Sequence, residues 1–230
     1  MYKYAAVALV GIFALVLGYG AYRMVTDPRE AKVETPETVA TTTISVRTET
    51  QSEDTADYSI DVSYPQFGIA PLDTAIRAAV ANAARDIKNQ AATDRPAAEG
   101  FRKYELFGSV DRTHVGREIS ATIILAQDFG GAHPLPIALT FNYTREGAEI
   151  TLTDALALIG KTLAEVSTES KAQLAAKLGD NVIAPEGADA EASNFETFEI
   201  SDSAVTFIFQ PYQVAPYAAG MPEVQFSRQN

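Results

Sequence analysis

The sequence predicts an α+β domain with antiparallel strands and two amphipathic helices, preceded by one N-terminal transmembrane helix and a flexible linker. Three patterns support this class. Apolar and polar residues alternate with period two along much of the chain after residue 44, as in strands with one buried face. Two longer segments instead repeat apolar residues every three or four positions, as amphipathic helices do. One long uncharged run lies near the N-terminus.

The uncharged run extends from Tyr4 to Tyr22, with one basic residue on each side. Its length is close to the roughly 20 apolar residues that a helix needs to cross a bilayer. A cleaved signal peptide is the alternative, but its apolar region would be shorter and would end in small residues, whereas tyrosines stand at this end. We therefore interpret residues 1–25 as an uncleaved membrane anchor.

Residues 26–43 are rich in Thr, Glu and Pro and contain few large apolar side chains. Such a segment cannot bury enough surface to order itself, so it is predicted to be a flexible linker. The folded domain is expected at residues 44–230, with a hairpin–helix half at 44–100 and a strand-rich half at 101–230.

The first half begins with two alternating runs, 44–49 and 58–64, which predict a β-hairpin across the polar segment QSEDTAD. A helix is expected next, from about Pro71 to Gln90, because proline suits a first helical turn. Its predicted buried positions are Leu72, Ile76, Val80, Ala83 and Ile87.

The second half is predicted to be mainly antiparallel strands. The expected strands are Lys103–Asp111, Glu118–Ala126, Ile137–Tyr143 and a short one at Glu149–Leu152, which leads into a helix start at Thr153-Asp154. A second amphipathic helix is expected from Lys161 to Leu178, with Gly179 as its stop. A last hairpin (Glu196–Ile200 and Val205–Phe209) and a final strand (Val224–Phe226) follow.

Charge and composition exclude several functions. The chain carries 18 Lys and Arg against 30 Asp and Glu, a net charge of −12, so it lacks the basic surface that nucleic acids or anionic lipids require. It has no cysteine, which removes disulfides, thiolate nucleophiles and cysteine metal sites. With only two histidines, a His-rich metal site is excluded as well. We expect no metal and no cofactor.

The segment from Asp128 to Pro134 (DFGGAHP) is the first candidate site. Asp128 could orient His133 as a general base. The alternative is a turn between strands whose glycines supply positive φ angles, and this is the interpretation we favour.

The segment from residue 207 to residue 220 (FIFQPYQVAPYAAG) is the second candidate. Tyr212 and Tyr217 could line a binding groove, since tyrosine offers a large face and a hydroxyl at small entropic cost. In the alternative both rings fold back over the end of the sheet. Asp128, His133, Tyr212 and Tyr217 are thus the candidate ligand-binding residues.

Five carboxylates also crowd one region: Glu186, Asp189, Glu191, Glu196 and Glu199. A carboxylate pair could hydrolyse a glycan or bind calcium. No D-x-D-x-D-G loop is present, and charge runs usually form a solvated surface. No serine near either histidine has the setting of a catalytic triad, so we expect no enzyme activity.

The GGAHP and F-x-F-x-P-Y-x-V-A-P-Y-A-A-G motifs, with F-x-Y-x-x-x-G-x-x-I-T-L-x-D between Phe141 and Asp154, resemble the PdaC/RsiV-like extracytoplasmic domain family. The resemblance covers about Thr43 to Arg228. This domain occurs in a lysozyme-sensing anti-sigma factor and ahead of a peptidoglycan deacetylase module. The chain lacks the deacetylase module and the cytoplasmic sigma-binding segment, so neither activity is expected here. The resemblance implies an exported binding domain, tethered by its N-terminal helix.

We therefore expect a single-pass protein of the plasma (inner) membrane whose C-terminal domain is extracytoplasmic. It would bind or sense an envelope ligand, either a lysozyme-like protein or a cell-wall glycan. Two alternatives stay open at this point: a cell-wall glycan hydrolase that uses a carboxylate pair, and a structural or assembly protein of the envelope.

Overall fold

The computed structural model describes residues 43–94 and 102–229, which belong to one compact unit that begins at Thr43. The predicted anchor and nearly all of the predicted linker lie outside these residues. Within the two described ranges, no helix is long and apolar enough to span a membrane.

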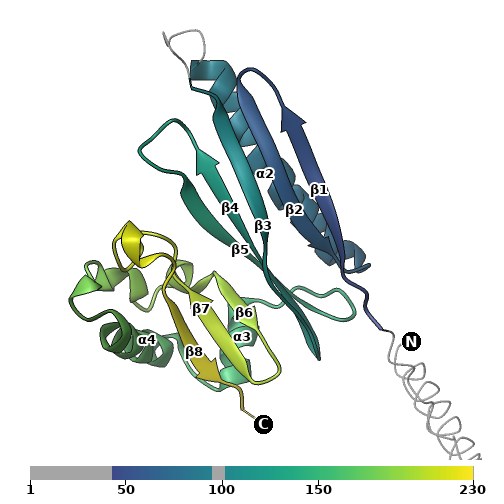
Figure 1. Ribbon diagram of the computed structural model, residues 1–230. Coiled ribbons are helices and arrows are strands. Elements are labelled where there is room, and N and C mark those ends of the chain that lie inside the picture. The colour runs from purple at the N-terminus through teal and green to yellow at the C-terminus, as the bar shows by residue number, and fades with distance from the viewer. Residues whose placement is uncertain (1–42, 95–101, 230) are drawn as a thin grey trace, which may run out of the picture. The chain divides into compact units, whose positions relative to one another are not determined.

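A five-stranded sheet forms the first layer (Figure 1). Its strands follow chain order: β1 (Arg47–Asp54), β2 (Tyr58–Gln66), β3 (Tyr104–Val115), β4 (Glu118–Asp128) and β5 (Leu135–Thr144). The predicted β1–β2 hairpin is confirmed, but its turn is shorter than expected. Most of the polar segment is strand, because Gln51 pairs with Val62 and Asp54 pairs with Ser59.

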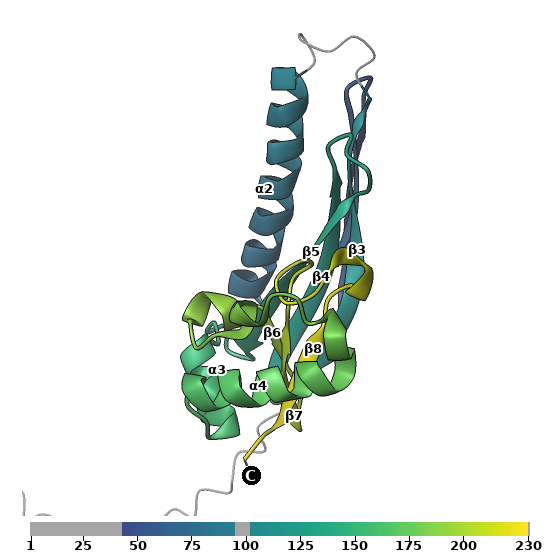
Figure 2. The ribbon, with the colours of Figure 1, turned by 90° about the vertical axis from the view of Figure 1, so that its left-hand side faces the viewer.

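Helix α2 (Ala70–Asp94) covers one face of this sheet (Figure 2). It buries six of its apolar side chains nearly completely: Leu72, Ile76, Val80, Ala84, Ile87 and Ala91. The buried position predicted for Ala83 is thus occupied by Ala84, while Ala83 is only partly buried. Because α2 returns the chain to the end where β2 began, β3 starts beside Tyr58 and runs parallel to β2, with Tyr104 opposite Tyr58. The expectation of purely antiparallel sheets is wrong for this one pair.

The chain after β5 differs from the prediction in one element. The expected strand at 149–152 is wrong, since only an isolated bridge joins Glu149 to Tyr143 and a helix, α3 (Leu152–Ile159), begins there. Thr151 caps α3 and forms a capping box with Asp154, so the helix starts before the predicted Thr153. The described residues therefore hold three α-helices, not two.

Helix α4 (Leu163–Leu178) confirms the second predicted helix and ends at Gly179, which has a positive φ. A three-stranded antiparallel sheet follows, in the order β6 (Phe198–Ile200), β7 (Ala204–Ile208) and β8 (Glu223–Ser227). Short 3-10 turns lie at Gly179–Asn181, Pro185–Ala188, Ala192–Phe195 and Tyr217–Ala219. The predicted last hairpin and final strand are confirmed.

Two hydrophobic cores result. Core one lies between α2 and the five-stranded sheet, within residues 44–143. Core two lies between the three-stranded sheet and helices α3 and α4, within residues 150–226. The division predicted at residue 100 therefore falls inside the span of core one, and the cores separate between Tyr143 and Ile150.

The junction between the two sheets is polar. The face of β4 and β5 opposite α2 meets β6 through Asn142, whose side chain accepts from Ser120 Oγ (2.7 Å) and donates to the Phe198 carbonyl (2.7 Å). Arg112 on β3 reaches Glu199 Oε1 (2.9 Å) and also pairs with Glu223. The two sheets are thus joined by directional hydrogen bonds and ion pairs, while their apolar residues stay in separate cores.

Candidate functional site

The second candidate segment forms a tight turn that displays Tyr212. The Gln213 N–H donates to the Gln210 carbonyl (3.0 Å), and Pro211 stands at the second position of the turn. Tyr212, at the third position, has a φ of 68°, as in a type II turn. This position favours glycine, and among the described residues Tyr212 is the one non-glycine residue with positive φ. Its side chain is 51% exposed, so the strained backbone holds a large ring in solvent.

Two glutamines fix this turn to the rest of the domain. The Gln210 side chain accepts from the Ala138 N–H (3.0 Å) and donates to the Ala138 carbonyl (2.9 Å) at the free edge of β5. The Gln213 side chain donates to the carbonyls of Gly187 (2.9 Å) and Asn194 (3.0 Å). Gly187 permits this approach, since a Cβ there would lie 1.9 Å from the Gln213 carbonyl oxygen. The turn is therefore rigidly anchored.

The two candidate segments meet at three aromatic rings. The His133 ring stacks on Tyr217, with centroids 3.8 Å apart and an interplanar angle of 24°. Tyr212 lies beside Tyr217 at 5.9 Å and 34°. We call His133, Tyr212 and Tyr217 the aromatic platform. Residues more than 75 positions apart in the chain thus form one surface, since Tyr212 and His133 are separated by 79 positions.

Hydrogen bonds hold the platform together and determine the tautomer of its histidine. The Pro134 carbonyl accepts from Tyr217 Oη (3.1 Å) and lies 3.1 Å from His133 Nδ1. Because a carbonyl can only accept, Nδ1 carries the proton in the neutral ring. His133 Nε2 is then the acceptor for the Tyr212 hydroxyl at 3.4 Å. Tyr217 is half-buried and Tyr212 is exposed, so the two rings differ, whereas each sequence alternative treated them alike.

Asp128 does not orient His133 as a general base, the role considered from the sequence. Its buried carboxylate pairs with Arg102 Nη2 (2.5 Å) and accepts from the Gly130 N–H (2.8 Å). Among the described residues, no hydrogen bond joins Asp128 to His133. Asp128 therefore shapes the loop between β4 and β5, and the Asp–His arrangement needed for base catalysis is not formed.

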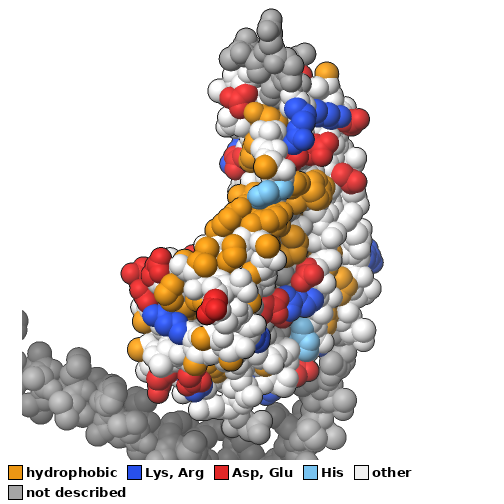
Figure 3. All heavy atoms as spheres, turned by 60° about the vertical axis from the view of Figure 1, so that its left-hand side comes forward, with side chains coloured by type: hydrophobic (Ala, Val, Ile, Leu, Met, Phe, Trp, Pro, Cys, Tyr) orange, Lys and Arg blue, Asp and Glu red, His pale blue; other side chains and the backbone are white. Residues whose placement is uncertain are grey.

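Exposed apolar side chains extend the surface around these loops, and they were not singled out from the sequence. Phe129 and Leu135 are each 41% exposed next to the β4–β5 loop, and Ile183 is 61% exposed. The backbone of Ile183 bonds to the Val214 carbonyl (3.1 Å), which places it beside the tyrosine segment. Figure 3 shows a broad hydrophobic band on this side of the molecule, with a histidine inside it and acidic side chains at its margin.

Two of the five predicted carboxylates, Glu199 and Asp189, are paired with different basic side chains. Glu199 is bound to Arg112 and accepts from Thr122 Oγ1 (3.1 Å), and burial raises the pKa of its carboxyl. Asp189 pairs with Lys171. Within residues 43–94 and 102–229, no group of three or more His, Cys, Asp or Glu side chains is arranged to hold a metal ion.

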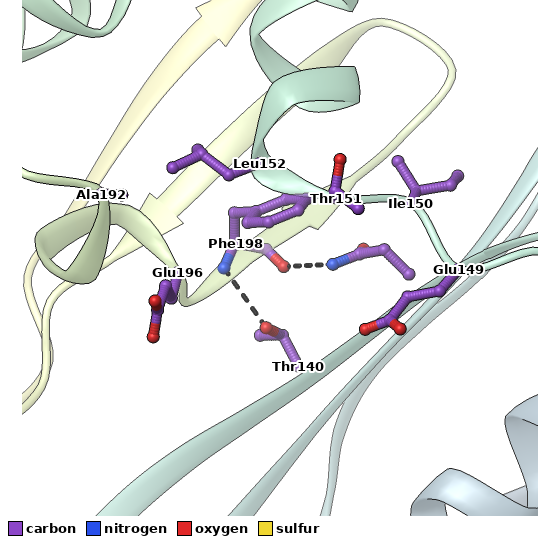
Figure 4. Close-up of a pocket in the computed structure, with 9 residues that line it drawn as sticks. Thr140, Glu149, Ile150, Thr151, Leu152, Ala192, Glu196 and Phe198 are labelled. Atoms are coloured by element: carbon purple, nitrogen blue, oxygen red, sulfur yellow. Dashed lines mark hydrogen bonds between the residues drawn. The ribbon is translucent and has the colours of Figure 1, made fainter.

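A concave site, separate from the aromatic platform, lies between β5, the start of α3 and the segment before β6 (Figure 4). It is a cavity of about 410 Å³. Thr140 and Asn142 from β5, Leu152 from α3 and Phe198 from β6 contribute to its lining, together with Glu149 and Glu196. Among these residues, Glu196 was the one that the sequence analysis considered for carboxylate chemistry.

Comparisons with known proteins place these features in a family context. Residues 154–229 match the model of a family described as a protein of unknown function (DUF3298). The fold is similar to that of a DUF3298 family protein from Pseudomonas aeruginosa PAO1, with 17% identity and a TM-score of 0.53, covering 80% of this chain and 91% of that one. A DUF3298 family member from Bacteroides fragilis NCTC 9343 also matches, with 17% identity, a TM-score of 0.47, and 80% and 90% coverage. No curated protein matches this chain.

The match covers the C-terminal third of the chain, including Tyr212 and Tyr217 but not His133. At 17% identity, the likeness to the Pseudomonas protein shows a shared fold only. The comparisons thus show a match to the DUF3298 family model over residues 154–229 and a similar fold. They do not test the more specific PdaC/RsiV-like resemblance.

Proposed function

We propose that this protein is a membrane-anchored, extracytoplasmic binding or sensing module, and that the aromatic platform contacts its envelope ligand. One observation carries the proposal. Tyr212 stays exposed in a backbone conformation that costs a non-glycine residue about 1 kcal/mol or more. A purely structural turn would favour glycine at this position. Strain of this kind is typical of ligand clamps and other functional surfaces.

The leading ligand class is a basic protein such as lysozyme. Residues 31–230 hold 15 basic and 28 acidic side chains, so a basic partner would be steered towards this domain. The acidic segment at residues 180–196 runs beside the tyrosine turn, tied to it through Gln213 and Val214. An Arg or Lys side chain from the partner would then find tyrosine faces and carboxylates together, a favourable setting for cation–π contacts.

The PdaC/RsiV-like resemblance agrees with this ligand class and with an outward-facing domain. A cell-wall glycan is the other ligand that fits the platform, because sugar rings stack on aromatic faces. In both cases the predicted anchor at residues 1–25 would hold the domain at the outer side of the plasma membrane.

The test compares binding of the full-length chain with that of Tyr212→Gly. Surface plasmon resonance against immobilised lysozyme, at low and moderate salt, should show binding that weakens with salt. Tyr212→Gly should weaken it at least about tenfold, the loss expected when an aromatic anchor is removed. The same variant should unfold at a higher temperature, because glycine relieves the positive-φ strain.

Phe107→Ala is the matched control, since Phe107 is 44% exposed on β3 and makes no ring contact with the platform. It should bind as the wild type does. A parallel arm uses soluble peptidoglycan fragments in place of lysozyme. The proposal fails if neither ligand binds at either salt concentration, or if Tyr212→Gly binds both as tightly as the unchanged chain.

A further inference from the structure

The cavity between β5 and α3 has an apolar wall with a carboxylate on each side (Figure 4). Phe198 and Leu152 supply the wall, while Glu149 and Glu196 lie on opposite sides of it. Its volume of about 410 Å³ falls within the range of small-molecule sites, roughly 300–1,000 Å³. The cavity shares no lining residue with the aromatic platform.

The neutral polar groups of the cavity already have partners. Thr140 Oγ1 accepts from the Phe198 N–H (3.3 Å), and both ends of the Asn142 amide are hydrogen-bonded. Glu149 and Glu196 are exposed, and across residues 43–94 and 102–229 neither forms an ion pair. The groups left to recognise a ligand are therefore two carboxylates separated by hydrocarbon.

We propose that this cavity binds an aliphatic diamine or polyamine, with one ammonium group at Glu149 and another at Glu196. The methylene chain between them would lie along Leu152 and Phe198, which removes apolar surface from water while both charged ends stay near the opening. A lone metal ion fits this site less well, because the described donors do not form a group of three or more around one point.

Isothermal titration calorimetry of the full-length chain with 1,5-diaminopentane and with spermidine tests the proposal. Both amines should bind, and added salt should lower the affinity of each. Glu149→Gln and Glu196→Gln should each weaken binding by about tenfold, as expected for one charged hydrogen bond. Pentylamine, with one ammonium group, should bind more weakly than the diamine by a similar factor. Pentane-1,5-diol should not bind.

Glu146→Gln is the matched control, because it removes the same charge from an exposed residue that does not line the cavity. It should bind both amines as the wild type does. Tyr212→Gly should do the same, which separates this site from the proposed ligand surface. The inference is overturned if the wild type takes up neither amine, if Glu146→Gln loses as much affinity as the cavity variants, or if pentylamine equals the diamine.

Discussion

Core one consists mostly of aliphatic residues from α2 and one face of the five-stranded sheet, whereas core two gathers five phenylalanines: Phe195, Phe198, Phe207, Phe209 and Phe226. Core one joins regular elements to each other. Core two also buries irregular segments, because Phe195 lies in a 3-10 turn and Val214 and Ala215 belong to the tyrosine segment. The aromatic core is thus the base on which the exposed platform rests.

The difference separates the packed cores, which stabilise this domain, from the loops that we propose to contact a ligand. Large rings fill the space between irregular segments. Their edge-to-face contacts stabilise the fold beyond the gain from burying apolar surface. The polar junction between the sheets lets each core pack by itself. Substitutions at Phe207, Glu118 and Thr162 test this separation.

Phe207→Ala should have the largest effect. Phe207 is 1% exposed and makes edge-to-face contacts with Phe195 (5.3 Å) and Phe226 (5.8 Å). Removing the ring leaves a cavity and should lower the free energy of unfolding by about 3–5 kcal/mol, measured by urea denaturation. Hydrogen exchange should show greater loss of protection in β6–β8 than in β1–β5. Equal loss in both sheets would mean that the cores unfold as one unit.

Glu118→Gln tests the junction. Glu118 on β4 forms two short bonds with Arg228 after β8 (2.6 and 2.8 Å), and the Arg228 side chain is 6% exposed. Breaking this pair should cost about 2–4 kcal/mol at pH 7, because a buried guanidinium loses its counter-charge. Glu49→Gln is the control, because Glu49 forms an exposed pair with Arg77. Its free energy of unfolding should be close to that of the wild type.

The junction pair also predicts a pH dependence. Its hydrogen bonds with Arg228 lower the pKa of Glu118 from its ordinary value of 4.5. The pair therefore stabilises the fold above that value and is lost as the pH falls through the lower pKa of the folded state. Urea melts at pH 7, 5 and 4, with lower pH values as the fold allows, should show the Glu118→Gln difference shrinking below pH 4.5. A difference that is constant down to acid unfolding would contradict this assignment.

Thr162→Ala should have the smallest effect. Helix α4, beside core two, begins at a local capping box between Thr162 and Glu165. Helix α2, beside core one, is held instead by Asp73, which accepts from the N–H groups of Phe67 (2.8 Å) and Gly68 (2.9 Å). Losing the Thr162 cap should lower the free energy of unfolding by about 1 kcal/mol, measured in thermal or urea melts. Thr162→Ser should restore it, and a loss without this rescue would point to a packing effect.

Much of the local structure could be predicted from the sequence because it depends on neighbouring residues. Alternation gave the strands of both sheets, and spacing gave α2 and α4. The start of the short helix α3 was placed two residues late, at Thr153 and not at its capping residue Thr151, since Thr151 lies in a stretch whose apolar residues also suit a strand. For the candidate site, the sequence pointed to Tyr212, Tyr217 and His133 in two separate loops, but the stacking of these rings carries no local signal.

By itself, the sequence determined the acidic charge, the absence of cysteine chemistry, the order of most elements and the aromatic content of two loops. Three features instead depend on the packed fold: the parallel pairing of β2 with β3, the separation of the two cores, and the stacking of His133 on Tyr217. The difference follows from the distance along the chain over which each kind of interaction acts. Periodicity and capping act over a few residues, whereas strand pairing and ring stacking depend on how distant segments share space once the cores are packed.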